Sequence, residues 1–460
     1  MRRKAPGVAR FGFSALQNQR ISPNLMPTHC KFPHCTKSHK IHTFAQNRKI
    51  HENSGLTHYL SSLVLQETRL PATAPPEEKG NITTMSIKVS HQFDAGAIEV
   101  VSATDAKAID LKIRKDSHSD FSQWFYFRLQ GAGGQACTIR MVNAGETSYP
   151  DGWEGYQAVA SYDNDEWFRV PTSFDGKVMT INHTPEYDSV YYAYFEPYSF
   201  ERHLSLIDRA QASPLVRVQD LGNTVDGRDF NMLTIGNPAA AKKVWVIARQ
   251  HPGETMAEWF IEGMVDALLD NANPIARQLL EKAVFYVVPN MNPDGSVRGN
   301  LRTNAAGANL NREWMTPTLE RSPEVFYVKN RIAETGVDLF LDVHGDEALP
   351  YNFVAGNQMI EGFSAELIEE QKRFIEDFKV ASPDFQDKVG YADSKYSADM
   401  LTLASKFVGH TYKCLALTLE MPFKDNANMP DEHVGWDGAR SARLGEAILQ
   451  PVLRSITRQA

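Results

Sequence analysis

The segment His251-Pro-Gly-Glu254 carries an imidazole and a carboxylate three residues apart. It lies between an apolar stretch at residues 244–248, which predicts a strand, and a helical pattern that follows it. A strand-to-helix turn of this kind can direct both side chains at one divalent metal ion. His344 ends a second apolar strand pattern and supplies a third ligand. The set predicts a His2Glu site with an open fourth position, which is typical of catalytic rather than structural zinc.

Other polar residues could act on a substrate beside such a metal. Asn311-Arg312 sets a planar guanidinium next to an amide, which suits bidentate binding of a carboxylate. Arg302 adds a second positive charge. Glu420 ends a strand pattern and is either an ordinary strand-end carboxylate or a general base. The segment Pro289-Asn-Met-Asn-Pro-Asp-Gly295 is rich in turn-forming residues and predicts a loop.

The elements that must position these residues follow a strand–helix alternation from about residue 204 onward. Strand patterns cover residues 244–248, 283–288, 339–343 and 414–419. Helical patterns lie near residues 256–270, 322–335, 362–379 and 437–455. The alternation predicts an α/β domain at residues 204–460, with a mixed sheet covered by helices. The chemical motifs directly follow strands, where open α/β sheets place their ligands.

Residues 85–203 predict a different architecture. Short aromatic or β-branched stretches are separated by turn signals such as Pro150-Asp-Gly152. These stretches cover residues 98–101, 124–129, 137–142, 167–170 and 190–195. The pattern predicts a small antiparallel β-sandwich domain that precedes the α/β domain.

Residues 1–84 are basic and rich in His, Ser, Asn and Thr, a composition typical of disorder. They are also compatible with an organelle-targeting segment, or with translated upstream sequence and a true start at Met85. Three His and two Cys between His29 and His39 could bind zinc, but their spacing fits no common zinc finger.

Composition limits the classes of partner. Residues 1–50 hold ten of the 48 Lys and Arg and no Asp or Glu, so the remaining 410 residues carry 38 basic and 56 acidic side chains. An acidic body argues against a nucleic acid partner. Apolar runs are too short to span a membrane, and four cysteines are too few for a disulfide scaffold. We therefore expect a cytoplasmic protein; its oligomeric state is left open.

The order of the motifs resembles that of the M14 zinc carboxypeptidases, and within them a bacterial-type member of the cytosolic carboxypeptidase subfamily. The segment at residues 192–200 resembles the signature Phe-Ala-Tyr-x-x-Pro-Tyr-Thr-Tyr, which closes the subfamily's N-terminal β domain. The resemblance covers residues 86–456. The other shared motifs are His-Pro-Gly-Glu (251–254), Asn-Pro-Asp-Gly (292–295), Arg302, Asn-Leu-Asn-Arg (309–312), Asp-Val-His-Gly (342–345) and Thr-Leu-Glu (418–420).

This resemblance implies one zinc ion per chain, held by His251, Glu254 and His344. It implies that Glu420 is the general base and later the proton donor, and that Arg302 stabilises the oxyanion. The chemistry is consistent, because zinc lowers the pKa of its water to about 7 and a nearby carboxylate can accept the proton. The implied reaction is hydrolysis of the C-terminal residue of a peptide or protein tail.

For the substrate, the resemblance implies that Asn311 and Arg312 bind the terminal carboxylate, which limits cleavage to free C-termini. A tyrosine that contacts the substrate is expected at Tyr396, with Tyr391 as a weaker candidate, although both could be packing residues. Eukaryotic members of the subfamily remove glutamates, which makes Glu or Asp the candidate C-terminal residue. Lys406 is then either a cation in the side-chain pocket or an ordinary solvated lysine.

Asn309 departs from the family pattern, because many members have Asp at this position. That Asp orients the zinc-bound histidine, and an Asn carbonyl could do the same without a charge. We therefore expect Asn309 to contact His251. Two alternative functions stay open: a zinc-dependent deacylase of N-acyl amino acids, and a non-catalytic protein that binds peptide C-termini.

Overall fold

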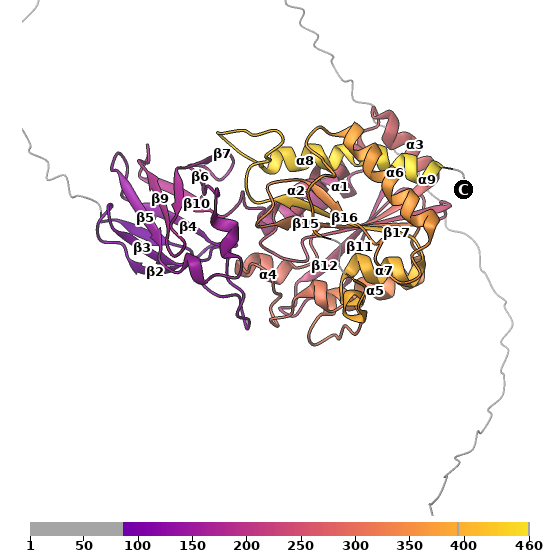
Figure 1. Cartoon of the computed structure of the whole chain (residues 1–460), viewed down its shortest axis with the longest axis horizontal. Coiled ribbons are helices and arrows are strands. Elements are labelled where there is room, and N and C mark those ends of the chain that lie inside the picture. The colour runs from indigo at the N-terminus through magenta and orange to yellow at the C-terminus, as the bar shows by residue number, and fades with distance from the viewer. Residues whose placement is uncertain (1–85, 393–394, 459–460) are drawn as a thin grey trace, which may run out of the picture. The chain divides into compact units, whose positions relative to one another are not determined.

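The computed structural model describes residues 86–392 and 395–458 (Figure 1). The predictions for residues 1–84, including the His and Cys cluster, lie outside the described residues. Both cysteines in the described part, Cys137 and Cys414, are buried and free. None of the helices described there is long and apolar enough to cross a membrane.

Residues 86–195, which we call the N-terminal sheet region, form two five-stranded sheets. In both sheets the strand pairs are antiparallel, except that β3 runs parallel to β5. The exception arises because β4 lies in the other sheet, so the chain leaves after β3 and returns in the same direction. The first sheet has the order β1 (Lys88–Ser90), β4 (Tyr126–Gln130), β10 (Ser189–Ala193), β6 (Val159–Ser161) and β7 (Trp167–Arg169). The second has the order β2 (Glu99–Ser102), β3 (Ile109–Lys112), β5 (Cys137–Met141), β9 (Met179–His183) and β8 (Thr172–Phe174).

One apolar core joins these two sheets. Strand β5 alternates between buried and partly exposed positions, so that Cys137, Ile139 and Met141 all face inward. Phe127 and Leu129 of the first sheet belong to the same buried cluster. The predicted antiparallel β region is therefore confirmed.

The rest of the described chain builds a seven-stranded mixed sheet. The four central strands are parallel, and the outer strands pair antiparallel. The predicted mixed α/β fold is confirmed. The order is β11 (Val216–Asn223), β12 (Asp229–Ile235), β14 (Ala283–Val288), β13 (Lys242–Ala248), β15 (Leu339–Asp346), β17 (Leu415–Pro422) and β16 (Phe353–Ala355).

Helices cover both faces of this sheet (Figure 1). Trp245 and Ile247 of β13 pack in one buried cluster, and Val244 and Val246 pack in the other, because alternate side chains of a strand point to opposite faces. The first cluster includes side chains of α5 (Pro323–Thr335) and α7 (Ala404–Tyr412). The second includes side chains of α1 (Phe200–Gln211), α2 (Met256–Leu269), α3 (Pro274–Lys282), α6 (Ala365–Ala381), α8 (Gly438–Ala447) and α9 (Leu449–Thr457).

The helices differ from the sequence prediction, which missed α1, α3 and α7. The single helix expected at residues 437–455 is divided into α8 and α9 at Ile448. Pro451 explains the break, because it has no N–H to donate to the carbonyl four residues earlier. Helix α1 spans the predicted domain boundary at residue 203/204, and the described residues on both sides of that boundary form one compact unit.

The sheet brings the predicted chemical residues to one edge. His251 follows β13, and His344 lies opposite Glu420 in the register of β15 and β17. The strand that follows β13 in the chain, β14, lies on one side of it, and β15 lies on the other. Such a reversal of strand order opens a crevice at the carboxyl ends of the strands, where α/β sheets bind ligands.

Candidate active site

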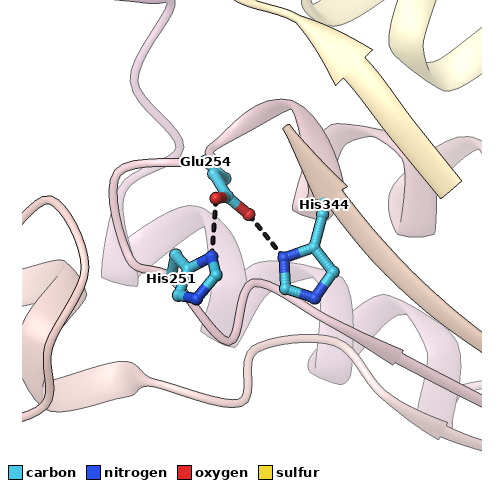
Figure 2. A group of neighbouring side chains, drawn as sticks. All are labelled: His251, Glu254 and His344. Carbon is cyan, nitrogen blue, oxygen red and sulfur yellow. Dashed lines mark hydrogen bonds and ion pairs between the residues drawn. The ribbon is translucent and has the colours of Figure 1, made fainter. Parts of the chain in front are cut away.

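Three side chains from two strand ends converge on one point. The Glu254 carboxylate lies between two imidazole rings and turns one oxygen to each (Figure 2). Its Oε1 is 2.6 Å from Nδ1 of His251, and its Oε2 is 2.8 Å from Nδ1 of His344. The three potential ligand atoms lie within 4.8 Å of one another, and all three residues are buried.

The far nitrogen of each imidazole has its own oxygen partner. Nε2 of His251 is 3.1 Å from the side-chain oxygen of Asn309, as expected from the sequence. Nε2 of His344 is 2.9 Å from Oδ1 of the buried Asp342. A metal-binding histidine usually donates its second N–H to a carbonyl or carboxylate, which fixes the ring and leaves the other nitrogen free to bind. Both rings therefore present Nδ1 to the common point.

This donor set fits zinc. Two imidazole nitrogens and one carboxylate form a three-ligand set of the catalytic kind. Burial, and then the positive charge of Arg302, lower the pKa of His251 to about 3, so that this ring is neutral. Burial also acts to lower the pKa of His344, but the carboxylates of Asp342 and Glu254 outweigh it and raise that pKa, so a metal bound by this ring would displace a proton. Burial raises the pKa of Glu254, but the two histidines outweigh it, and the net pKa lies below the usual range.

A buried ion pair holds the turn that carries two of these residues. The guanidinium of Arg249 donates from Nε to the carbonyl of Pro252 at 2.9 Å, and from one terminal nitrogen to Glu258 at 2.7 Å. Arg249 has a left-handed backbone conformation, with φ of 59°. Neither Arg249 nor Glu258 was expected from the sequence, since nothing in their spacing marks them as partners.

Glu420 and Arg302 flank the cluster. Glu420 is buried, and its Oε2 has no hydrogen-bond partner among the described residues. Burial raises its pKa well above the usual range. The pKa of Arg302 is raised although burial acts to lower it, because anionic neighbours outweigh the burial. The arrangement places a buried carboxyl group of raised pKa and a fixed cation beside the three-residue cluster.

The two residues expected to bind a carboxylate lie in the short helix η3 (Leu310–Arg312). Asn311 is engaged within the protein: its side-chain oxygen accepts from the backbone N–H of Ala404 at 2.8 Å, and its nitrogen is 3.3 Å from Nε2 of His344. Arg312 is exposed, and its guanidinium donates to the carbonyl of Asn311 at 2.6 Å. Burial of its head group and repulsion from Arg302 lower the pKa of Arg312. The more available of the two is therefore Arg312.

Of the two candidate tyrosines, Tyr391 contacts the end of the strand that carries His344. Its side chain is 53% exposed, and its hydroxyl donates to Oδ2 of Asp346 at 2.7 Å. Tyr396 is partly buried, and no hydrogen bond or ring contact is recorded for it within the described part of the chain. Contacts or charge effects thus link His251, Glu254, His344, Glu420, Arg302, Asn311 and Arg312 to one another, whereas none of those described involves Tyr396.

Two more residues at the site carry no sequence motif. Tyr149 comes from the N-terminal sheet region, and its ring lies 5.5 Å from the Arg302 guanidinium. Glu347 follows the strand that carries His344 and is buried with an unpartnered Oε1. Burial raises the pKa of Glu347 to about 8. Its position directly after the strand that carries His344 is the one sequence feature that could have predicted Glu347.

A mixed sheet with a buried His2Glu cluster, an adjacent buried carboxylate and a fixed guanidinium defines a metallohydrolase of the α/β class. Residues 89–195 match the cytosolic carboxypeptidase N-terminal domain family, and residues 204–432 match the zinc carboxypeptidase family. The chain belongs to the M14 zinc carboxypeptidase family and is an enzyme of the metallocarboxypeptidase class.

Solved structures and curated relatives agree with this assignment. A metallo-carboxypeptidase from Burkholderia cenocepacia is 58% identical over 81% of this chain and 99% of its own, with a TM-score of 0.80. A metallo-carboxypeptidase from Pseudomonas aeruginosa, solved with (2-guanidinoethylmercapto)succinic acid, is 46% identical over 80% of this chain and 98% of its own, with a TM-score of 0.77. Cytosolic carboxypeptidase 2 of Macaca fascicularis is 31% identical over 58% of this chain, which covers 36% of that protein.

Proposed function

We propose that this enzyme uses one zinc ion, held by His251, Glu254 and His344, to remove the C-terminal residue of peptides or protein tails. The observation that carries the proposal is the convergence of the three ligand atoms within 4.8 Å, with Asn309 and Asp342 behind the two rings. Bound zinc would supply a Lewis acid and lower the pKa of a water molecule to about 7.

Glu420 handles the protons in this proposal. Its raised pKa and its unpartnered Oε2 suit a carboxylate that accepts a proton from the attacking water and passes it to the leaving amine. Arg302 stabilises the negative charge that develops on the scissile carbonyl oxygen. One fixed donor at such a position is worth about 3 kcal/mol of transition-state stabilisation.

Arg312 confines the reaction to free C-termini. A guanidinium binds a carboxylate through two parallel hydrogen bonds, and an amidated terminus offers no such partner. Arg302 lies close enough to repel Arg312, so a carboxylate between them would be attracted by both. We assign Asn311 to the same subsite, and keep Tyr396 as a candidate substrate contact beside Tyr391.

An acidic C-terminal residue is the proposed preference, with Lys406 as its partner. Lys406 lies on α7 next to Ser405, whose hydroxyl is 2.7 Å from that of Thr418 on the strand that carries Glu420. The Lys406 amine donates to the carbonyl of Gly356, and an ammonium group has three N–H donors, so it can keep this partner when it binds a substrate carboxylate. Lys406→Met should reduce kcat/KM for peptides that end in Glu more than for peptides that end in Leu. Lys372→Met, on α6, is the control.

The cytosolic relatives support a cytoplasmic location. We also propose that residues 85–203 and 204–460 are two domains that share one compact unit.

The test uses three substrates with the zinc-loaded enzyme: a peptide, its C-terminal amide and the matching N-acyl amino acid. A fourth reaction repeats the peptide in the presence of a chelator. We expect cleavage of the free-acid peptide alone. Faster cleavage of the N-acyl amino acid would favour a deacylase, and cleavage of the amide at an equal rate would contradict the role of Arg312. A succinic acid derivative such as that bound by the Pseudomonas aeruginosa relative should compete with the peptide.

A further inference from the structure

The loop that carries Arg302 is held by a carboxylate from the N-terminal sheet region. Asp116 Oδ1 accepts the backbone N–H of Leu301 at 2.6 Å, and Oδ2 accepts those of Arg302 at 2.8 Å and Thr303 at 2.9 Å. The Thr303 hydroxyl donates to the same Oδ2 at 3.0 Å. We propose that Asp116 is a positioning residue for Arg302, so that the N-terminal sheet region takes part in catalysis by setting the place of the oxyanion-stabilising guanidinium.

The geometry of these bonds indicates a specific fit. Three successive amides point to one carboxylate, and such a concave set of N–H groups is a natural anion site. Hydrogen bonds to a charged acceptor are roughly twice as strong as neutral ones. Asp116 is 6% exposed, so water cannot easily replace it. A single side chain therefore accepts hydrogen bonds from the loop on both sides of Arg302.

The same region also holds the Arg302 side chain. The guanidinium lies 5.5 Å from the ring centre of Phe121 and 5.5 Å from that of Tyr149. Both distances are within the range of cation–π attraction. Among the described residues, Arg302 forms its backbone hydrogen bond with Asp116 and its ring contacts with Phe121 and Tyr149. The N-terminal sheet region thus contacts both the backbone and the guanidinium of Arg302.

Neighbouring contacts tie this loop to the same surface. Asn300 Oδ1 accepts the backbone N–H of Ser117 at 3.0 Å. Gly299 has a φ of 64°, and a Cβ there would lie 2.5 Å from the carbonyl of Ala95. The close approach therefore requires glycine. On the opposite side, the N–H of Gly253 donates to the carbonyl of Leu301 at 2.8 Å, so one residue separates Asp116 from the metal-ligand turn.

The inference rests on the proposed role of Arg302 and makes a separate prediction. In Asp116→Asn, an NH2 group replaces one acceptor and faces the loop amides, so the loop should shift without loss of side-chain volume. Misplacement of a catalytic group by about 1 Å can cost on the order of 100-fold in rate. We expect kcat to fall by about 10- to 100-fold, with KM changed less than threefold and zinc content unchanged. Asp120→Asn is the matched control, because Asp120 is exposed and pairs only with Lys115 among the described residues.

A double-mutant cycle distinguishes positioning from general damage. If Asp116 acts through Arg302, then Asp116→Asn should cost nothing further in kcat when it is added to Arg302→Ala. An equal loss in both backgrounds would overturn the inference. If Arg302→Ala itself leaves kcat intact, the proposed function of Arg302 fails, whatever Asp116 does.

A second variant keeps the inference testable if Asp116→Asn folds poorly, and hydrogen exchange tests the contact itself if Asp116→Asn folds well. Phe121→Ala removes a ring from the guanidinium and leaves the carboxylate in place; its kcat loss should likewise vanish in the Arg302→Ala background. Hydrogen exchange of the full-length zinc-loaded enzyme should show faster exchange of the amides at residues 301–303 in Asp116→Asn. Unchanged exchange at those amides would contradict the proposed contact.

Discussion

Asn309→Ala tests whether the contact between Asn309 and His251 supports zinc binding. The side-chain oxygen of Asn309 lies 3.1 Å from Nε2 of His251, in a site where that ring is buried. Removal of the acceptor leaves a buried N–H unpaired, which costs about 1–3 kcal/mol. Loss of such partners typically weakens metal binding by about 10- to 100-fold, and we expect the zinc Kd to rise by that factor.

A second substitution at the same position, Asn309→Asp, should not weaken zinc binding. Asn309→Asp converts a neutral acceptor into a charged one, and charge-assisted bonds are roughly twice as strong. Zinc affinity should then equal or exceed that of the parent enzyme. The assay is competition with a chromophoric chelator at fixed pH, with the exposed Asn237 replaced by Ala as control. A Kd for Asn309→Ala within twofold of the control would refute the reasoning.

Three further predictions concern the proposed general base Glu420, the proposed carboxylate-binding residue Arg312 and the pH dependence of stability at Glu324. Glu420→Gln should lower kcat by at least about 100-fold while one zinc per chain stays bound, and a kcat within threefold of the parent would remove Glu420 from the reaction. Arg312→Ala should lower kcat/KM for a free-acid peptide by about 10- to 100-fold, mainly through KM; no loss would mean that the carboxylate binds elsewhere. Burial raises the pKa of Glu324 to about 8 from 4.5, so its favourable contribution is complete below about pH 4.5 and is lost as the pH rises through 8. Glu324→Gln should therefore have a flatter Tm between pH 5 and 9 than the parent, unlike exposed Glu320→Gln, and parallel melting curves would contradict this.

The central strands and the metal ligands could be predicted from sequence for a physical reason. Residues 244–248 and 283–288 are buried on both faces, so they form apolar runs that are easily recognised. The ligands follow such runs directly, and the carboxyl ends of parallel strands meet at one edge of the sheet. The predictions for His251, Glu254 and His344 derive from this local pattern, whereas the role of Glu420 was implied only by the family resemblance.

The contacts that support Arg302 could not be predicted in the same way. Asp116 lies 186 residues before Arg302, and its role depends on the packing of two regions, which no periodicity records. Tyr149 is likewise brought to the site by tertiary structure alone. Helices α3 and α7 were missed because nine residues are too few to give a clear helical period. Helix α1 was missed although four of its twelve residues are buried, since the predicted boundary at residue 203/204 divides it.

The most direct test of the central claim is a zinc titration of the metal-free enzyme with a free-acid peptide as substrate. Activity should rise linearly and reach its plateau at one zinc per chain, and His344→Ala should neither bind this zinc tightly nor gain activity. Full activity without added metal, or full activity in zinc-treated His344→Ala, would contradict the assignment of the His251, Glu254 and His344 cluster as the catalytic metal site.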